Sequence, residues 1–158
     1  MRVIVLGVGN TLLSDEGIGV RTVEQLLHDY ILPQEVEAID GGTSAMELLE
    51  DLCGTDHLIV VDAVRSGNTP ATIIKLAGAE VPVFFRTKLS PHQVGLSDVL
   101  ATLALMGEAP GSTTVIGVEP QSLALGMALT AAVADQLPQV VQMVKSELNG
   151  LGFALEKR

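Results

Sequence analysis

The sequence predicts an α/β protein: a three-layer α/β/α arrangement with a mostly parallel, twisted sheet of about five strands and helices on both faces. Two observations lead to this expectation. Short apolar runs alternate along the chain with longer stretches of helical periodicity. The runs are continuously apolar, as in Leu58-Ile-Val-Val61, which is typical of strands that are buried on both faces of a sheet.

Composition is consistent with one folded domain over residues 1–158, with a tail after about residue 149 that is loose or forms a short terminal strand. Hydrophobic residues make up 47% of the chain and charged residues 18%, which argues against disorder. Aromatic residues are only 3% and the formal net charge is −10, so the sequence offers neither stacking platforms nor a basic surface. We therefore expect no nucleic-acid partner.

The start of the chain and its one cysteine bear on the cellular compartment. Residues 3–6 form an apolar run of strand length without the cleavage pattern of a secretory signal. No apolar run is long enough to span a bilayer. Cys53 excludes an internal disulfide, and within a predicted helix it is interpreted as a small buried thiol. We expect a cytoplasmic monomer with no membrane partner.

The first half of the chain predicts three strands and two helices. The strands are short β-branched runs closed by Gly or Asp: residues 2–7, 36–39 and 57–61. A helix is expected over residues 17–32, whose apolar stripe is stopped by Pro33. A second helix is expected after Ser44, which has the spacing of a capping box with Glu47.

The second half continues the alternation. Strands are expected over residues 71–77 and 113–118, and a helix over residues 94–106. A long final helix is expected over residues 123–148, interrupted near Pro138.

Three acidic residues lie at the ends of predicted strands: Glu16 follows the first strand, Asp40 ends the second and Asp62 ends the third. Ligands of open α/β sheets bind outside the carboxyl ends of the strands, so these carboxylates are expected to face one crevice. Close carboxylates repel one another unless one takes up a proton or the group binds a cation. Each acid also has a purely structural interpretation. Asp15 and Glu16 would cap the following helix, and Asp40 would be a turn residue.

His92 adds a possible nitrogen ligand. It lies in Ser90-Pro-His-Gln93, a pattern typical of a helix start, where the helix dipole favours a neutral imidazole. His28 and His57 are weaker candidates, because one lies within a predicted helix and the other begins a strand at the opposite edge. Two oxygen donors and one nitrogen donor suit Zn, Ni, Co or Mn, and three protein ligands leave positions open for substrate.

The pair Gly7-Val-Gly9 invites a nucleotide-binding interpretation. The dinucleotide fingerprint needs a third glycine where Leu12 stands, and the chain has no P-loop motif. We interpret the pair as a tight turn that brings the backbone close to a bound chain. A nucleotide-binding domain remains an alternative.

The sequence resembles the hydrogenase maturation endopeptidases, which process the large subunit of nickel–iron hydrogenases. Five motifs of that family occur in order along nearly the whole chain: Gly7-Val-Gly-Asn-Thr-Leu-Leu-Ser-Asp-Glu-Gly-Ile-Gly19, Asp40-Gly-Gly-Thr43, Val60-Val-Asp-Ala63, Ser90-Pro-His92 and Gly117-Val-Glu-Pro120.

The resemblance implies an endopeptidase that removes a short C-terminal extension from a nickel-loaded large-subunit precursor. It implies that Glu16, Asp62 and His92 ligate nickel, which arrives with the substrate, and that Asp40 takes part in cleavage. Other divalent ions such as Zn or Cd could occupy the same ligands in vitro. We expect Asp40 to act as general base or to position the attacking water, an aspartyl-protease-like role. The alternative is a non-enzymatic nickel-binding chaperone of hydrogenase assembly, which would not need Asp40.

Overall fold

The strands of the protein form a five-stranded sheet and a small two-stranded sheet in a computed structural model that describes residues 1–82 and 91–158, without the side chains of residues 45 and 91–94. The large sheet has the order β3-β1-β4-β6-β5. Its members are β1 (Val3–Val8), β3 (Val36–Gly42), β4 (His57–Ala63), β5 (Ile73–Ala77) and β6 (Ser112–Val118). All neighbouring pairs are parallel except β5 with β6, which is antiparallel.

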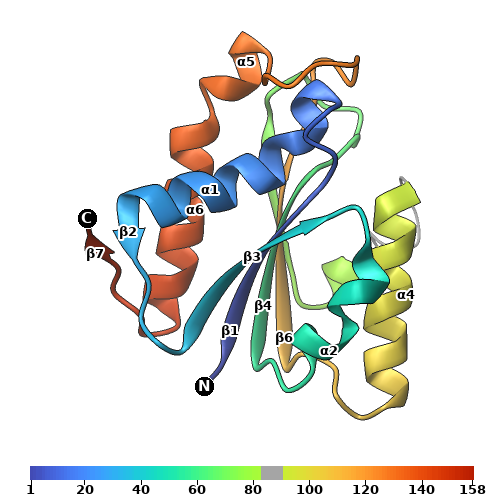
Figure 1. Ribbon diagram of the computed structural model, residues 1–158, viewed down its shortest axis with the longest axis vertical. Helices are drawn as coiled ribbons and strands as arrows, with labels where there is room; N and C mark the ends of the chain where they lie inside the picture. Colours follow the sequence, from blue (N-terminus) through green and yellow to red (C-terminus); the bar gives the residue numbers. More distant parts are fainter. Residues whose placement is uncertain (83–90) are drawn as a thin grey trace.

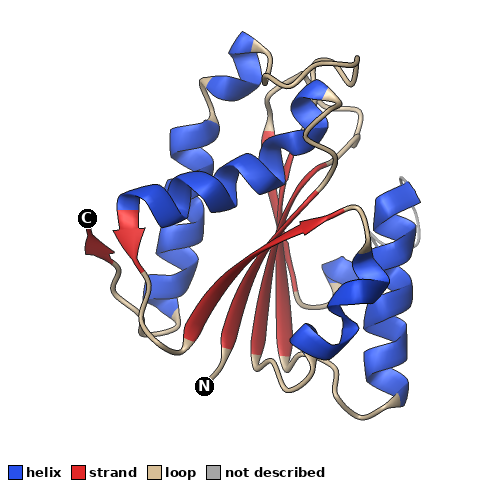
Figure 2. Cartoon of the chain, in the orientation of Figure 1, coloured by secondary structure: helices blue, strands red, loops and turns tan. Residues whose placement is uncertain are grey.

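Helices cover both faces of this sheet, as Figures 1 and 2 show. One face carries α1 (Ile18–Asp29), which follows the short 3₁₀ helix η1 (Ser14–Gly17), together with α5 (Ala131–Ala134) and α6 (Leu137–Gly150). The other face carries η2 (Ala45–Leu48), α2 (Leu49–Leu52) and α4 (Pro91–Leu105). The predicted α/β/α layering is therefore confirmed. No helix in the described part of the chain has the length and apolarity needed to cross a membrane.

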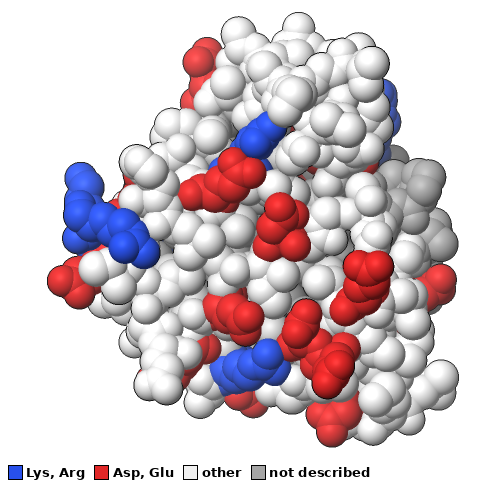
Figure 3. Space-filling view, viewed as in Figure 1, with Lys and Arg blue, Asp and Glu red and all other residues white. Residues whose placement is uncertain are grey.

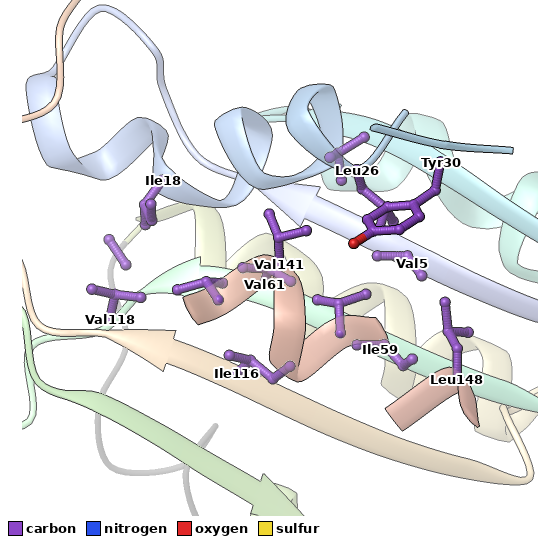
Figure 4. Packing of buried hydrophobic residues seen from close by; sticks show 14 of the residues in the cluster. Val5, Ile18, Leu26, Tyr30, Ile59, Val61, Ile116, Val118, Val141 and Leu148 are labelled. Atoms are coloured by element: carbon purple, nitrogen blue, oxygen red, sulfur yellow. The ribbon is translucent and has the colours of Figure 1, made fainter. Parts of the chain in front are cut away.

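The central strands contribute side chains to two hydrophobic cores, one on each face of the sheet. In β1, Val3 and Val5 belong to the core under α1 and α6, whereas Ile4 and Leu6 belong to the core under α4. All four side chains are fully buried. Figure 4 shows the first core, where residues of α1, β4 and α6 meet. This division explains the continuously apolar strands, because alternate residues of a strand face opposite sides of the sheet.

The first helix is shorter than predicted. It ends at Asp29, and Tyr30 adopts an extended conformation. Tyr30–Ile31 then forms β2, which pairs antiparallel with β7 (Glu156–Lys157) near the C-terminus. The apolar periodicity continues to Leu32, but pairing with a strand from the other end of the chain decides the conformation of these residues. The same pairing ties down the terminal segment as a short strand.

The predicted final helix over residues 123–148 is wrong in its first part. Residues 121–130 form an irregular loop, and the helical conformation is confined to α5 and α6. Pro138 lies in the first turn of α6, where a missing N–H costs no helical hydrogen bond. The loop is held by contacts with residues 12–15, described below, which a local pattern cannot reveal.

Two smaller expectations also need correction. Ser44 is the N-cap of η2 but makes no side-chain capping bond, because the helix opens as a tight 3₁₀ turn in which the Glu47 N–H donates to the Ser44 carbonyl (3.1 Å). The strands β3 and β4 run to Gly42 and Ala63. Both strands extend beyond the predicted ends at residues 39 and 61, and Asp40 and Asp62 lie within their last residues.

Candidate functional site

Asp40 and Asp62 lie at the same edge of the sheet, formed by the carboxyl ends of the parallel strands. Asp40 is beside Gly7 of β1, and Asp62 is beside Gly117 of β6. The strand β4 pairs with β1 up to Val61 and with β6 as far as Ala63, so the backbone of Asp62 lies at the end of a strand with two neighbours. Asp62 is only 2% exposed. The predicted meeting of strand ends is thus confirmed for these two residues.

Glu16 reaches the same edge through glycines. A Cβ on Gly9 would lie 2.0 Å from the Glu16 carbonyl oxygen, and a Cβ on Gly19 would lie 2.1 Å from the Val61 carbonyl oxygen. Both glycines therefore let η1 and the start of α1 press against the ends of β1 and β4. The half-buried Glu16 side chain accepts a hydrogen bond from the Asn10 backbone N–H (Oε1, 3.3 Å). Glu16 is held on the turn that leaves β1.

Asp40 is exposed, unlike Asp62. Its Oδ1 accepts a hydrogen bond from the backbone N–H of Gly42 (3.0 Å), and Gly42 has a φ of +51°. The Gly42 carbonyl in turn accepts the Gly9 N–H (2.9 Å), which joins the end of β3 to the turn after β1. The turn-residue interpretation is therefore correct as far as Oδ1 is concerned. A carboxylate has further lone pairs, so the exposed Asp40 can still accept a proton from water.

The predicted histidine ligand lies at the start of α4. The helix begins at Pro91, so His92 is in its first turn, as the sequence indicates. The His92 side chain lies outside the described residues, and Ser90 does too. Among the side chains that the structure describes, no three His, Cys, Asp or Glu residues are grouped closely enough to hold a metal ion. The ligand set of Glu16, Asp62 and His92 therefore stays a prediction.

A residue that sequence reasoning misplaced is Asp15. It is fully buried, and it does not cap α1, whose N-cap is Gly17. Its Oδ2 accepts the backbone N–H groups of Gln121 (2.9 Å) and Ser122 (3.0 Å), and its Oδ1 accepts the backbone N–H of Thr130 (2.8 Å). The Thr130 hydroxyl also donates to this carboxylate. Asp15 thus fastens both ends of the loop 121–130 beside Glu16.

Comparison with known proteins agrees with this geometry. The family model HycI, hydrogenase maturation protease, matches residues 20–147. The chain belongs to the hydrogenase maturation protease family. It is 49% identical over 153 residues to the hydrogenase 2 maturation protease of Escherichia coli K12, covering 96% of this chain and 93% of that protein. It is 42% identical over 158 residues to the hydrogenase expression/formation protein HupD of Rhodobacter capsulatus, covering 99% and 75%.

Solved structures support the same family assignment. The hydrogenase maturating endopeptidase HybD of E. coli superposes with a TM-score of 0.96 at 48% identity, over 100% of this chain and 98% of that one. The [NiFe] hydrogenase maturation protease HybD of Thermococcus kodakarensis shares the fold, with a TM-score of 0.77 at 24% identity over 93% and 99%. As a member of this protease family, the chain is a hydrolase, and we set aside the chaperone and the nucleotide-binding domain.

In this maturation protease a fourth acid, Glu119, lies at the same sheet edge but has a structural role. It is 7% exposed, and its Oε1 accepts the backbone N–H groups of Ser66 (2.8 Å) and Asn68 (3.1 Å) and the Ser66 hydroxyl (2.9 Å). The carboxylate shapes the connection between β4 and β5. The sequence indicated Glu119 only as part of a family motif, since its partners lie about 50 residues earlier in the chain.

The surroundings of four glycines at this edge show where the backbone is already in contact. The turn at Gly7 and Gly9 is tight, but the backbone that approaches it is the protein's own: a Cβ on Gly7 would lie 2.3 Å from the Gly19 carbonyl oxygen. Gly41 faces inward, where a Cβ would lie 2.7 Å from Leu6 Cδ1. Gly42 faces open space. Of these four glycines, Gly42 is the one with open space at its Cβ position.

Proposed function

We propose that this protease removes a C-terminal extension from the large-subunit precursor of a nickel–iron hydrogenase and that it uses nickel in the precursor as its recognition element. The observation that carries the proposal is the arrangement of Glu16, Asp40 and Asp62 at one sheet edge in a member of the hydrogenase maturation protease family. The names of its relatives, a hydrogenase 2 maturation protease and a hydrogenase maturating endopeptidase, support this substrate class.

In this proposal Glu16, Asp62 and His92 complete the coordination of the nickel that the precursor brings. Two carboxylates and a neutral imidazole are suitable donors for nickel. Three protein donors leave coordination positions open for the ligands of the precursor, which suits recognition of a delivered ion. Zn or Cd added in vitro would compete for the same donors.

Asp40 supplies the chemistry in this proposal. It is the exposed member of the three acids, on the outermost strand of the sheet, and its Oδ1 is oriented by the Gly42 N–H. The carboxylate takes a proton from the attacking water as the water adds to the scissile carbonyl carbon. The proton then passes to the leaving amine when the C–N bond breaks. Gly42, which faces open space, leaves room for the substrate backbone beside Asp40.

The test is cleavage of a matched pair of precursors, one loaded with nickel and one prepared without it, followed by mass spectrometry of the large subunit. We expect the shortened product from the loaded form only. Equal cleavage of the nickel-free form would remove the recognition role of the metal, and no cleavage of either would remove the proposed substrate. The expected monomeric state is checked by light scattering, and the expected cytoplasmic location by fractionation.

A further inference from the structure

The loop 121–130 beside the site has an unusual composition for this chain. Residues 120–134 contain no charged residue, although the whole chain has a net charge of −10. Figure 3 shows that the upper end of the molecule, over α5 and the loops next to it, is largely free of the acidic groups that are scattered over the rest of this face. This uncharged surface adjoins the sheet edge that carries Glu16, Asp40 and Asp62, and the contrast in charge needs an explanation.

This loop is joined to the turn that carries Glu16. The backbone N–H of Gly126 donates to the Leu12 carbonyl (2.8 Å), and the N–H of Ser14 donates to the Gly126 carbonyl (2.8 Å), which makes a parallel bridge between Leu13 and Gly126. The Ser14 hydroxyl donates to the Ala124 carbonyl (2.6 Å). With the clamp made by Asp15, these bonds hold the loop and the turn as one unit.

Three large apolar side chains project from this unit. Leu12 is 51% exposed, Leu125 is 86% exposed and Met127 is 69% exposed. Leu12 precedes Leu13, and Leu125 and Met127 flank Gly126, so the bridge between Leu13 and Gly126 brings these three exposed residues to the same part of the surface. We name these three residues the apolar lip. Solvent contact with such a cluster is unfavourable, and clusters of this kind mark interaction sites.

Further polar contacts hold the backbone of the lip. The Arg21 guanidinium donates to the Met127 carbonyl (2.9 Å), and the buried Asp15 holds both ends of the loop. The buried Asp15 carboxylate binds an exposed loop and makes no contribution to the hydrophobic core. It does fix the backbone of the lip before any partner arrives, which lowers the entropy cost of binding.

We propose that the apolar lip is the docking surface for the hydrogenase large-subunit precursor, where it binds apolar side chains that flank the scissile bond. The inference rests on the proposed function. The lip is continuous with the site, because Leu12 and Glu16 lie on the same turn and Asn10 joins that turn to the Glu16 carboxylate. A protein that brings its chain to Asp40 and a metal to Glu16 must cover the neighbouring rim. Because this rim is uncharged, the matching segment of the partner is apolar and not basic.

The chain offers a matched control. Leu105 is the last residue of α4 and Met106 follows it; they are 90% and 54% exposed, and this end of α4 lies toward the opposite edge of the sheet (Figure 1). The experiment compares the double variant Leu125→Ser/Met127→Ser with Leu105→Ser/Met106→Ser. For the lip variant we expect KM for nickel-loaded precursor to rise about 10- to 100-fold with kcat nearly unchanged, because two apolar contacts are lost from binding. For the control variant we expect wild-type KM.

Thermal melts, direct binding and the oligomeric state complete the test. Thermal melts of both variants are expected to match the wild type, because all four side chains are exposed. An unchanged KM in the lip variant would overturn the docking surface. If the wild type cleaves no precursor, direct binding of precursor to wild type and lip variant still tests docking separately from the proposed function. A wild-type dimer that the lip substitutions dissociate would overturn the proposal in favour of a second copy of this chain.

Discussion

The two edges of the central sheet both collect ionisable residues, but they use them in opposite ways. At the amino edge, His57 begins β4 and hydrogen-bonds to the Ser112 hydroxyl through Nδ1 and to Thr114 Oγ1 through Nε2 (3.2 Å). The Thr114 hydroxyl donates to Glu147 Oε1 (3.0 Å), and Lys75 pairs with Glu147 Oε2 (2.6 Å). At the carboxyl edge, Asp40 is exposed at the end of β3.

This difference separates a structural network from a chemical site. At the amino edge each polar group meets a partner on another element, so α6, β5 and β6 are linked through His57 and Glu147. Burial lowers the pKa of His57, and the Glu147 carboxylate only partly offsets this effect. Such a closed network has no free position for a substrate. At the carboxyl edge, the buried Asp15 and Glu119 support loops, and Asp40 is left for the solvent and the substrate.

The largest effect is expected from neutralising Asp40 at the carboxyl edge of the sheet. In the variant Asp40→Asn, we expect kcat for precursor cleavage to fall by about 10²- to 10⁴-fold, because the amide cannot take a proton from water. The amide oxygen can still accept the Gly42 N–H, so the melting temperature should stay unchanged. The matched control is Glu37→Gln on the same strand, whose side chain is 59% exposed. A normal rate in Asp40→Asn would refute the base assignment.

The second prediction concerns the buried acid that holds the lip. Asp15→Ala removes the buried carboxylate that accepts three partly buried backbone N–H groups. We expect the free energy of unfolding to fall by about 3 to 5 kcal/mol, equivalent to about 10 °C in Tm. The exposed Asp135→Ala is the control, with an expected change within about 0.5 kcal/mol. Equal melting temperatures for the two variants would show that the clamp contributes nothing to stability.

The smallest expected effect is a pH dependence from the amino edge. Since the folded pKa of His57 lies below its ordinary value of 6.5, the unfolded chain binds more protons between the two values. The stability due to neutral His57 is therefore complete above about pH 6.5 and is lost as the pH falls through the folded pKa. Burial raises the pKa of Glu147, but hydrogen bonds from Lys75 and Thr114 outweigh this effect and lower it below its ordinary value of 4.5. The titration of Glu147 therefore changes the stability only at a pH below about 4.5.

Urea unfolding between pH 5.5 and 7.5 measures the slope of the free energy of unfolding against pH. We expect it to flatten in His57→Gln and to stay unchanged in His28→Gln, since the His28 side chain is 82% exposed on α1. Cleavage by folded His57→Gln should proceed at the normal rate. A slope that persists in His57→Gln would assign the pH dependence to other groups.

Local patterns in the sequence predicted most of this architecture. The apolar runs over residues 2–7 and 57–61 indicated buried parallel strands, which the structure contains as β1 and β4, and the strand-end rule placed Asp40 and Asp62 at one edge. The same patterns failed where distant segments meet. Tyr30–Ile31 continues a helical stripe but pairs with Glu156–Lys157, and residues 121–130 have helical composition but form a loop.

The sequence by itself determined the layers of the fold, the edge at which the site lies and the family, because strand and helix periods and short motifs are local. Only the tertiary structure decided the roles of the acids. Asp15 and Glu16 are neighbours in the chain, yet Asp15 is buried by partners 106 to 115 residues away while Glu16 turns toward Asn10. Burial and hydrogen-bond partners separate a supporting carboxylate from a reactive one, and both depend on chain segments that meet only in the folded state.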